Sequence, residues 1–156
     1  MLKYPLAIFN RYLRLVPAYF VAMIIFYQTV PHSGSGPVWE AGIPETEKCD
    51  SMWKSLLFIN NLTDGLNVCM NWGWYLQNDM QLFIYSMAVL LAYNYKKFTS
   101  YMMIILSILC SLGYFFVVTQ VNGYHNINHT SDTSYTKDYM DVLYVKPWSR
   151  CPPYLY

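Results

Sequence analysis

One apolar stretch, from Tyr101 to Val121, contains no charged side chain and constrains the chain more than any other feature. It is long enough to cross a bilayer as a helix, which takes roughly 20 apolar residues. Only 12% of all residues are charged, against roughly 25% in an average soluble domain. These observations predict a membrane protein. The net charge of +1 and the scattered basic residues argue against a nucleic-acid partner.

Two further stretches reach the length of a membrane span. One runs from about residue 74 to 95 and is interrupted only near its start, by Gln77, Asn78, Asp79 and Gln81. The other covers about 6–30, with polar residues in its first half and a Pro17 that a membrane helix tolerates. The sequence therefore predicts an all-α, polytopic membrane protein with about three transmembrane helices plus the start of a fourth.

Basic residues give an orientation to these spans. They precede the body of the first span and fill the connection between the second and third: Lys3, Arg11, Arg14, Lys96 and Lys97. Loops rich in Lys and Arg tend to stay in the cytosol. The segments 31–73 and 122–147 are then expected to form loops on the outer side.

Other features of these loops fit an outer location. Asn61-Leu62-Thr63 and Asn128-His129-Thr130 are glycosylation sequons, which predicts glycans on Asn61 and Asn128. Cys49 and Cys69 share the first loop, and a bridge between them is the simplest pairing. Sequons and a disulfide together favour the endoplasmic reticulum or plasma membrane.

The remaining cysteines and the histidines predict no metal site. Cys110 lies in the third predicted span and is expected to be a small packing residue, whereas Cys151 is either a free thiol or paired elsewhere. The histidines all fall in predicted outer loops: His32, His125 and His129. The last two have a metal-like spacing, but their polar surroundings favour an irregular loop.

Asp79 lies a turn or so inside the second predicted span. A carboxylate at that depth is costly unless it is paired or faces a watery cavity, so it is a candidate functional residue. The alternative is that Asp79 sits at the interface and only solvates the helix start.

Arg11 and Arg14 are three positions apart, so a helix would bring them to one face. Guanidinium groups bind phosphates through two parallel hydrogen bonds, which favours a phosphate site. The alternative is topogenic, with both side chains reaching lipid phosphates and fixing the orientation of the helix.

At these residues the chain resembles the acyltransferase-3 family, and in particular the animal branch typified by the nose-resistant-to-fluoxetine proteins. The similar segments occur in family order and cover most of the chain: 10–19, 34–39, 56–61, 69–81 and 144–155. The resemblance implies a multi-span domain that moves an acyl group from cytosolic acyl-coenzyme A to a hydroxyl acceptor, often on a lipid or sugar.

The resemblance also implies roles for individual residues. Arg11 and Arg14 would engage the phosphates of coenzyme A, while Asn78, Asp79 and Gln81 would line the cavity where acceptor and donor meet. The family's presumed catalytic histidine follows an Asp-Gly-Leu-Arg-type motif on an earlier helix that this chain lacks. The chain is therefore expected to be a fragment that is inactive alone, surrounded by membrane lipids and the remaining helices of the domain. Acyl-coenzyme A is the donor substrate, and no metal is expected.

A different class of function stays open, a non-catalytic membrane protein that handles lipids or binds a partner. Its support is the missing histidine together with tryptophans in or beside the predicted outer loops, where they could form an interfacial belt. These are Trp39, Trp53, Trp72, Trp74 and Trp148.

Overall fold

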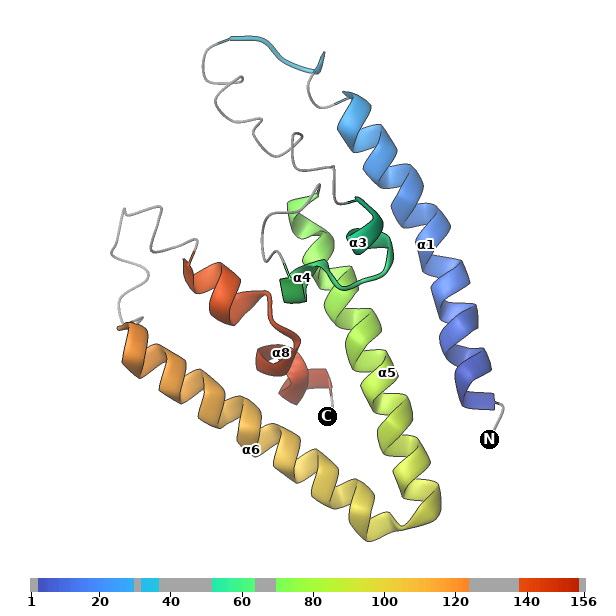
Figure 1. Ribbon diagram of the computed structural model, residues 1–156, viewed down its shortest axis with the longest axis vertical. Helices are drawn as coiled ribbons and strands as arrows, with labels where there is room; N and C mark the ends of the chain where they lie inside the picture. Colours follow the sequence, from blue (N-terminus) through green and yellow to red (C-terminus); the bar gives the residue numbers. More distant parts are fainter. Residues whose placement is uncertain (1–2, 30–31, 37–51, 64–69, 124–137, 155–156) are drawn as a thin grey trace. The chain divides into compact units, whose positions relative to one another are not determined.

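A computed structural model describes residues 3–29, 32–36, 52–63, 70–123 and 138–154, and within these ranges every regular element is a helix (Figure 1). In chain order they are α1 (Lys3–Thr29), α3 (Met52–Leu56), α4 (Asn60–Thr63), η3 (Asn71–Gly73), α5 (Trp74–Tyr95), α6 (Lys97–Asn122), η5 (Met140–Tyr144) and α8 (Pro147–Tyr154). The all-α prediction is confirmed for this part of the chain. The predicted Cys49–Cys69 bridge, the Asn128 sequon, His125 and His129 lie outside the described residues.

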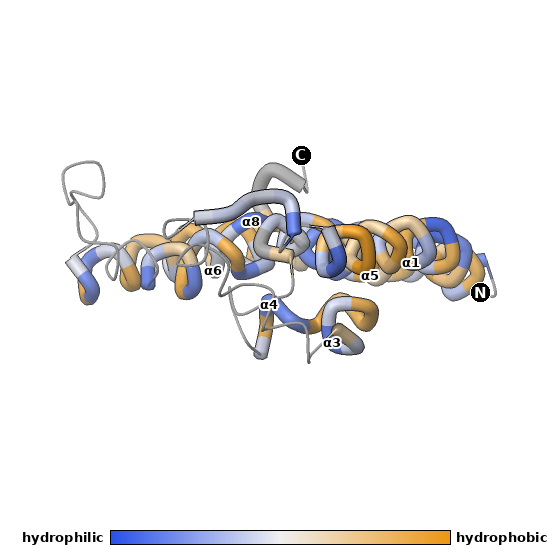
Figure 2. Tube along the Cα trace, turned by 90° about the horizontal axis from the view of Figure 1, so that it is seen from above, coloured by the Kyte–Doolittle hydropathy of each residue, from blue (hydrophilic) through white to orange (hydrophobic). Residues whose placement is uncertain are grey.

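Helices α1 and α6 are long and apolar enough to cross a membrane, and apolar residues recur along both (Figure 2). Helix α1 continues through Pro17. Helix α5 has the bounds predicted for the second span and 22 residues. Its polar first turns distinguish it from α1 and α6, so the third span stays a prediction.

The connection between α5 and α6 is a single residue. Lys96 is extended, with φ −150° and ψ 116°, and its backbone N–H donates to the Ala92 carbonyl at 2.8 Å. Helix α6 ends at Gly123, which adopts φ 67° and donates its N–H to the Thr119 carbonyl. A left-handed residue after the last helical turn is a common helix end, and glycine adopts it without steric cost.

The chain forms two compact units, residues 1–80 and 81–156, which are described separately. The core of the first unit consists of Tyr19, Met23, Phe58, Met70 and Met80. Helix α1 contributes Tyr19 and Met23, four positions apart, and flanks them with further apolar side chains at helical spacing: Ile8, Tyr12, Leu15, Val16 and Phe26. One face of α1 therefore packs inside this unit.

The turn that follows α3 contains an unusual residue. Phe58 has φ +57°, and the N–H groups of Phe58 and Ile59 donate to the carbonyls of Ser55 and Lys54, both at 3.1 Å. This pattern is a Schellman motif, whose left-handed position is usually glycine. The Phe58 ring stacks on Tyr19 with centroids 6.1 Å apart and meets the edge of Tyr12 at 5.9 Å. Ring packing therefore accompanies a backbone conformation that is costly for phenylalanine.

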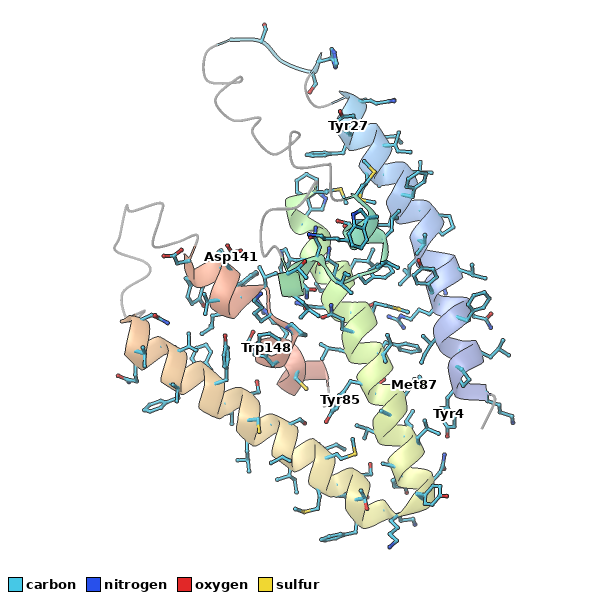
Figure 3. The ribbon with its side chains drawn as sticks, in the orientation of Figure 1. Tyr4, Tyr27, Tyr85, Met87, Asp141 and Trp148 are labelled. Carbon is cyan, nitrogen blue, oxygen red and sulfur yellow. The ribbon has the colours of Figure 1, made fainter. Side chains whose placement is uncertain are left out.

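In the second unit, side chains tie neighbouring helices to one another. Trp148 of α8, labelled in Figure 3, packs edge-on against Tyr114 of α6 with centroids 5.8 Å apart. The Tyr114 hydroxyl donates to the Val142 carbonyl of η5 at 2.7 Å. Cys151 is a buried free thiol. Cys110 is exposed on α6, a helix apolar enough to cross a membrane, and its role as a small packing residue stays a prediction.

Candidate functional site

Two consecutive side chains at the start of α5 bind α4. The Gln77 side-chain oxygen accepts from the Asn61 backbone N–H at 2.7 Å, and the Asn78 side-chain oxygen accepts from Asn61 Nδ2 at 2.6 Å. All three residues are buried. Because a buried amide is costly without hydrogen-bond partners, these bonds fix α4 against the first turns of α5.

The next residue, Asp79, binds α1 instead. Its Oδ2 accepts from Arg11 Nη2 at 2.6 Å, and the Arg11 and Asp79 side chains are 33% and 21% exposed. Successive residues of an α-helix point about 100° apart, which lets neighbouring side chains contact different elements. Of the two alternatives for Asp79, the structure supports a paired carboxylate, since pairing lowers the cost of a charge near apolar helices.

Two further contacts bring α1 close to the residues at the start of α5. Trp72 packs edge-on against Phe26 with ring centroids 5.0 Å apart, and a Cβ built on Gly73 would overlap the Tyr19 hydroxyl. The chain thus returns beside the C-terminal half of α1, and Arg11 lies two helical turns before Tyr19. From this position the long Arg11 side chain reaches the Asp79 carboxylate directly.

The other predicted site residues are placed differently. Arg14 is exposed on α1, so one arginine of the motif is held by Asp79 and the other faces outward. Gln81 is half-buried on α5, three positions after Asn78, and begins the second unit. The structure therefore brings together Arg11 and Asp79, and places Asn78 in the hydrogen-bonded layer beside them.

A buried polar layer, which the sequence did not predict, surrounds this start of α5. Asn60 Nδ2 donates to Ser55 Oγ at 3.0 Å, and the Tyr19 hydroxyl lies beside the side chains of Ser55 and Gln77. Within the described residues, the Tyr19 hydroxyl, Asn60 Oδ1 and Gln77 Nε2 are buried without a hydrogen-bond partner of normal geometry. Such groups are rare in folded proteins. The burial of Tyr19 could have been predicted from its spacing of four residues from Met23, which places both side chains on one face of α1.

The structure conflicts with a glycan on Asn61. Glycosylation would join the sugar to Asn61 Nδ2. This atom instead donates a hydrogen bond to the Asn78 side-chain oxygen, and Asn61 is 0% exposed. A bulky, surface-seeking glycan has no room there. The sequon pattern contains no information about burial, which is why it favoured this residue.

We expect Asn61 to remain unmodified. Thr63→Ala removes the sequon and keeps the Asn61 contacts. When both proteins are made in mammalian cells, the variant and the natural protein should have the same gel mobility, both before and after treatment with an N-glycosidase. Asn128→Gln is the matched control for the other sequon. A mobility shift that Thr63→Ala alone abolishes would contradict the buried placement.

Gly73→Ala should destabilise the first unit. The added methyl group overlaps the Tyr19 hydroxyl and lies 3.2 Å from Tyr19 Cζ, so we expect the free energy of unfolding to fall by about 1–3 kcal/mol. Thermal unfolding in detergent measures this loss. Gly113→Ala is the matched control, because nothing lies within 4 Å of its added Cβ.

Tyr19→Phe provides a second control for this contact. It removes the overlapping oxygen, so Gly73→Ala should cost less in the Tyr19→Phe background than in the natural protein. Equal costs in both backgrounds would show that the close approach of Gly73 to Tyr19 is not the cause.

Among the described residues, no group of three or more His, Cys, Asp or Glu side chains could hold a metal ion. The ion pair found in the described part of the first unit joins one arginine to one aspartate. Its chemistry is therefore that of a charge-assisted hydrogen bond with polar amides nearby.

Comparison with known proteins gives one relative for nearly the whole chain. Nose resistant to fluoxetine protein 6 from Caenorhabditis elegans is 30% identical over 164 residues, which cover 97% of this chain. The chain spans only 19% of that protein. No family model matches the chain, and no solved structure matches it. The likeness agrees with the branch that the sequence motifs resemble, and α1 and α6 support a membrane protein.

Proposed function

We propose that this chain is part of an integral-membrane acyltransferase that moves an acyl group from acyl-coenzyme A to a hydroxyl acceptor on a lipid or sugar-like molecule. The Arg11–Asp79 ion pair between α1 and α5 carries this proposal. Ionisable residues on helices that enter a membrane are costly and usually functional. The motif resemblance suggests the reaction class, and the likeness to the nematode protein agrees with the branch that these motifs resemble.

In this proposal, Arg11 and Arg14 bind the phosphates of the donor. A guanidinium group presents five N–H donors in a planar fork that matches phosphate oxygens. Arg14 is exposed and the Arg11 side chain is one-third exposed, so a ligand can reach both. The amide groups of Asn78 and Gln81, with Asp79, would line the cavity where donor and acceptor meet.

The reaction itself needs a general base. The acceptor oxygen attacks the thioester carbonyl and loses its proton to the base, and the thioester bond breaks to release coenzyme A as the protonated thiol. We assign the base to a histidine on a helix outside this chain. The remaining helices and the surrounding lipids complete the site, in the endoplasmic reticulum or plasma membrane.

Binding of radiolabelled acyl-coenzyme A in lipid nanodiscs tests this function. The chain would be compared with a form extended by its upstream coding sequence. We expect the extended form to bind, and Arg11→Ala/Arg14→Ala to weaken binding more than about tenfold through the loss of two charge-assisted contacts.

The matched control for this assay is Lys96→Ala/Lys97→Ala, which removes the same charge from exposed positions and should preserve binding. Absence of binding by both forms, or binding that the arginine substitutions leave unchanged, would overturn the proposal. Either result would favour a non-catalytic membrane protein.

A further inference from the structure

We propose that Asp79 is a positioning residue, whose carboxylate orients the Arg11 guanidinium toward the phosphates of the acyl donor. This inference rests on the proposed function and deepens it. It assigns Asp79 to the donor side of the site rather than to the acceptor. The geometry that carries it is the 2.6 Å contact between Arg11 Nη2 and Asp79 Oδ2.

Asp79 is well placed to hold another side chain, because its own turn of helix is fixed on both sides. The preceding Gln77 and Asn78 bind Asn61 of α4 at 2.7 and 2.6 Å. The following Met80 is 3% exposed and belongs to the core of the first unit. A carboxylate on such a rigid turn can fix the arginine that it binds.

Arg11 gains from this anchor in a way that Arg14 does not. An arginine side chain has many rotamers, and ordering them on ligand binding costs affinity. Asp79 holds the Arg11 guanidinium before the ligand arrives, while one-third of the side chain stays exposed. Exposed Arg14 would then attract the phosphates by its charge, and Arg11 would bind them in a fixed orientation.

Because Asp79 is negatively charged, the proposal can be tested by whether Asp79→Asn tightens or weakens donor binding. A carboxylate next to a phosphate site repels the phosphate, so Asp79→Asn should tighten donor binding if charge alone matters. If Asp79 positions Arg11, the same substitution should weaken binding although the site becomes more positive.

The experiment measures the affinity of the binding-competent form in nanodiscs for acyl-coenzyme A and for acyl-pantetheine, a donor without phosphates. We expect Asp79→Asn to weaken acyl-coenzyme A binding by about tenfold, the scale of one lost charge-assisted hydrogen bond. Asp79→Glu should recover most of the affinity, and acyl-pantetheine binding should not change. Asp141→Asn, the same charge change in η5, is the matched control.

Two further results separate positioning from folding and from the proposed function. In the Arg11→Ala background, Asp79→Asn should cause no additional loss, whereas a general folding defect would add to it. Equal or tighter acyl-coenzyme A binding by Asp79→Asn, or an equal loss of acyl-pantetheine binding, would overturn the positioning role. The proposed function would survive this, because it fails only when no form binds the donor or when the arginine substitutions leave binding unchanged.

Discussion

Replacing Phe58 with alanine should lower the free energy of unfolding by about 3 kcal/mol, as expected for an aromatic side chain lost from a core. Phe58 is 2% exposed, and its ring contacts the rings of Tyr12 and Tyr19. Thermal or denaturant unfolding in detergent measures the loss. Leu57→Ala is the matched control, because the neighbouring leucine is 52% exposed and its truncation should cost less than about 0.5 kcal/mol.

Phe58→Gly separates ring packing from backbone conformation. Glycine loses the same ring but adopts the +57° φ of this position without steric cost. We therefore expect Phe58→Gly to be about 1 kcal/mol less destabilising than Phe58→Ala. A glycine variant no more stable than the alanine variant would argue against the left-handed conformation at this helix end.

The second large effect concerns Arg11, since its removal leaves Asp79 without its partner. We expect Arg11→Leu to cost about 2 kcal/mol, between the values of exposed and buried ion pairs, because both side chains are partly exposed. Arg14→Leu removes the same charge one turn later, from an exposed position. It should change the unfolding free energy by less than about 0.5 kcal/mol.

Equal effects of Arg11→Leu and Arg14→Leu would contradict this distinction. The comparison also tests the two interpretations of the arginine pair, a phosphate site and a topogenic role. A purely topogenic role predicts similar changes in unfolding free energy for both substitutions. Unfolding is measured here without any acyl donor, so the result concerns the ion pair and not donor binding.

The long helices could be predicted because their signal is local. The second predicted span has the observed bounds of α5, and the first differs from α1 by three residues at its start and one at its end. Helix α6 begins at Lys97, four residues before the predicted 101. Its first turn is basic and polar, and apolar length alone does not detect such a turn.

The candidate site could be predicted only in part, because it depends on contacts between residues far apart in sequence. Asp79 was expected to need a partner or a cavity, and Arg11 was expected to bind an anion. Their contact spans 68 positions, and no local pattern shows which part of α1 lies beside the start of α5. The buried amide of Asn61 and the left-handed Phe58 follow from tertiary packing in the same way.

A double-mutant cycle between Arg11 and Asp79 tests the central claim, that these two groups bind each other in the first unit. Unfolding free energies would be measured for Arg11→Leu, Asp79→Leu and the double variant in one detergent. The structure predicts a coupling energy of about 1–2 kcal/mol, with the double variant less destabilised than the sum of the single variants. Additive effects, with a coupling near zero, would contradict the ion pair and the roles built on it.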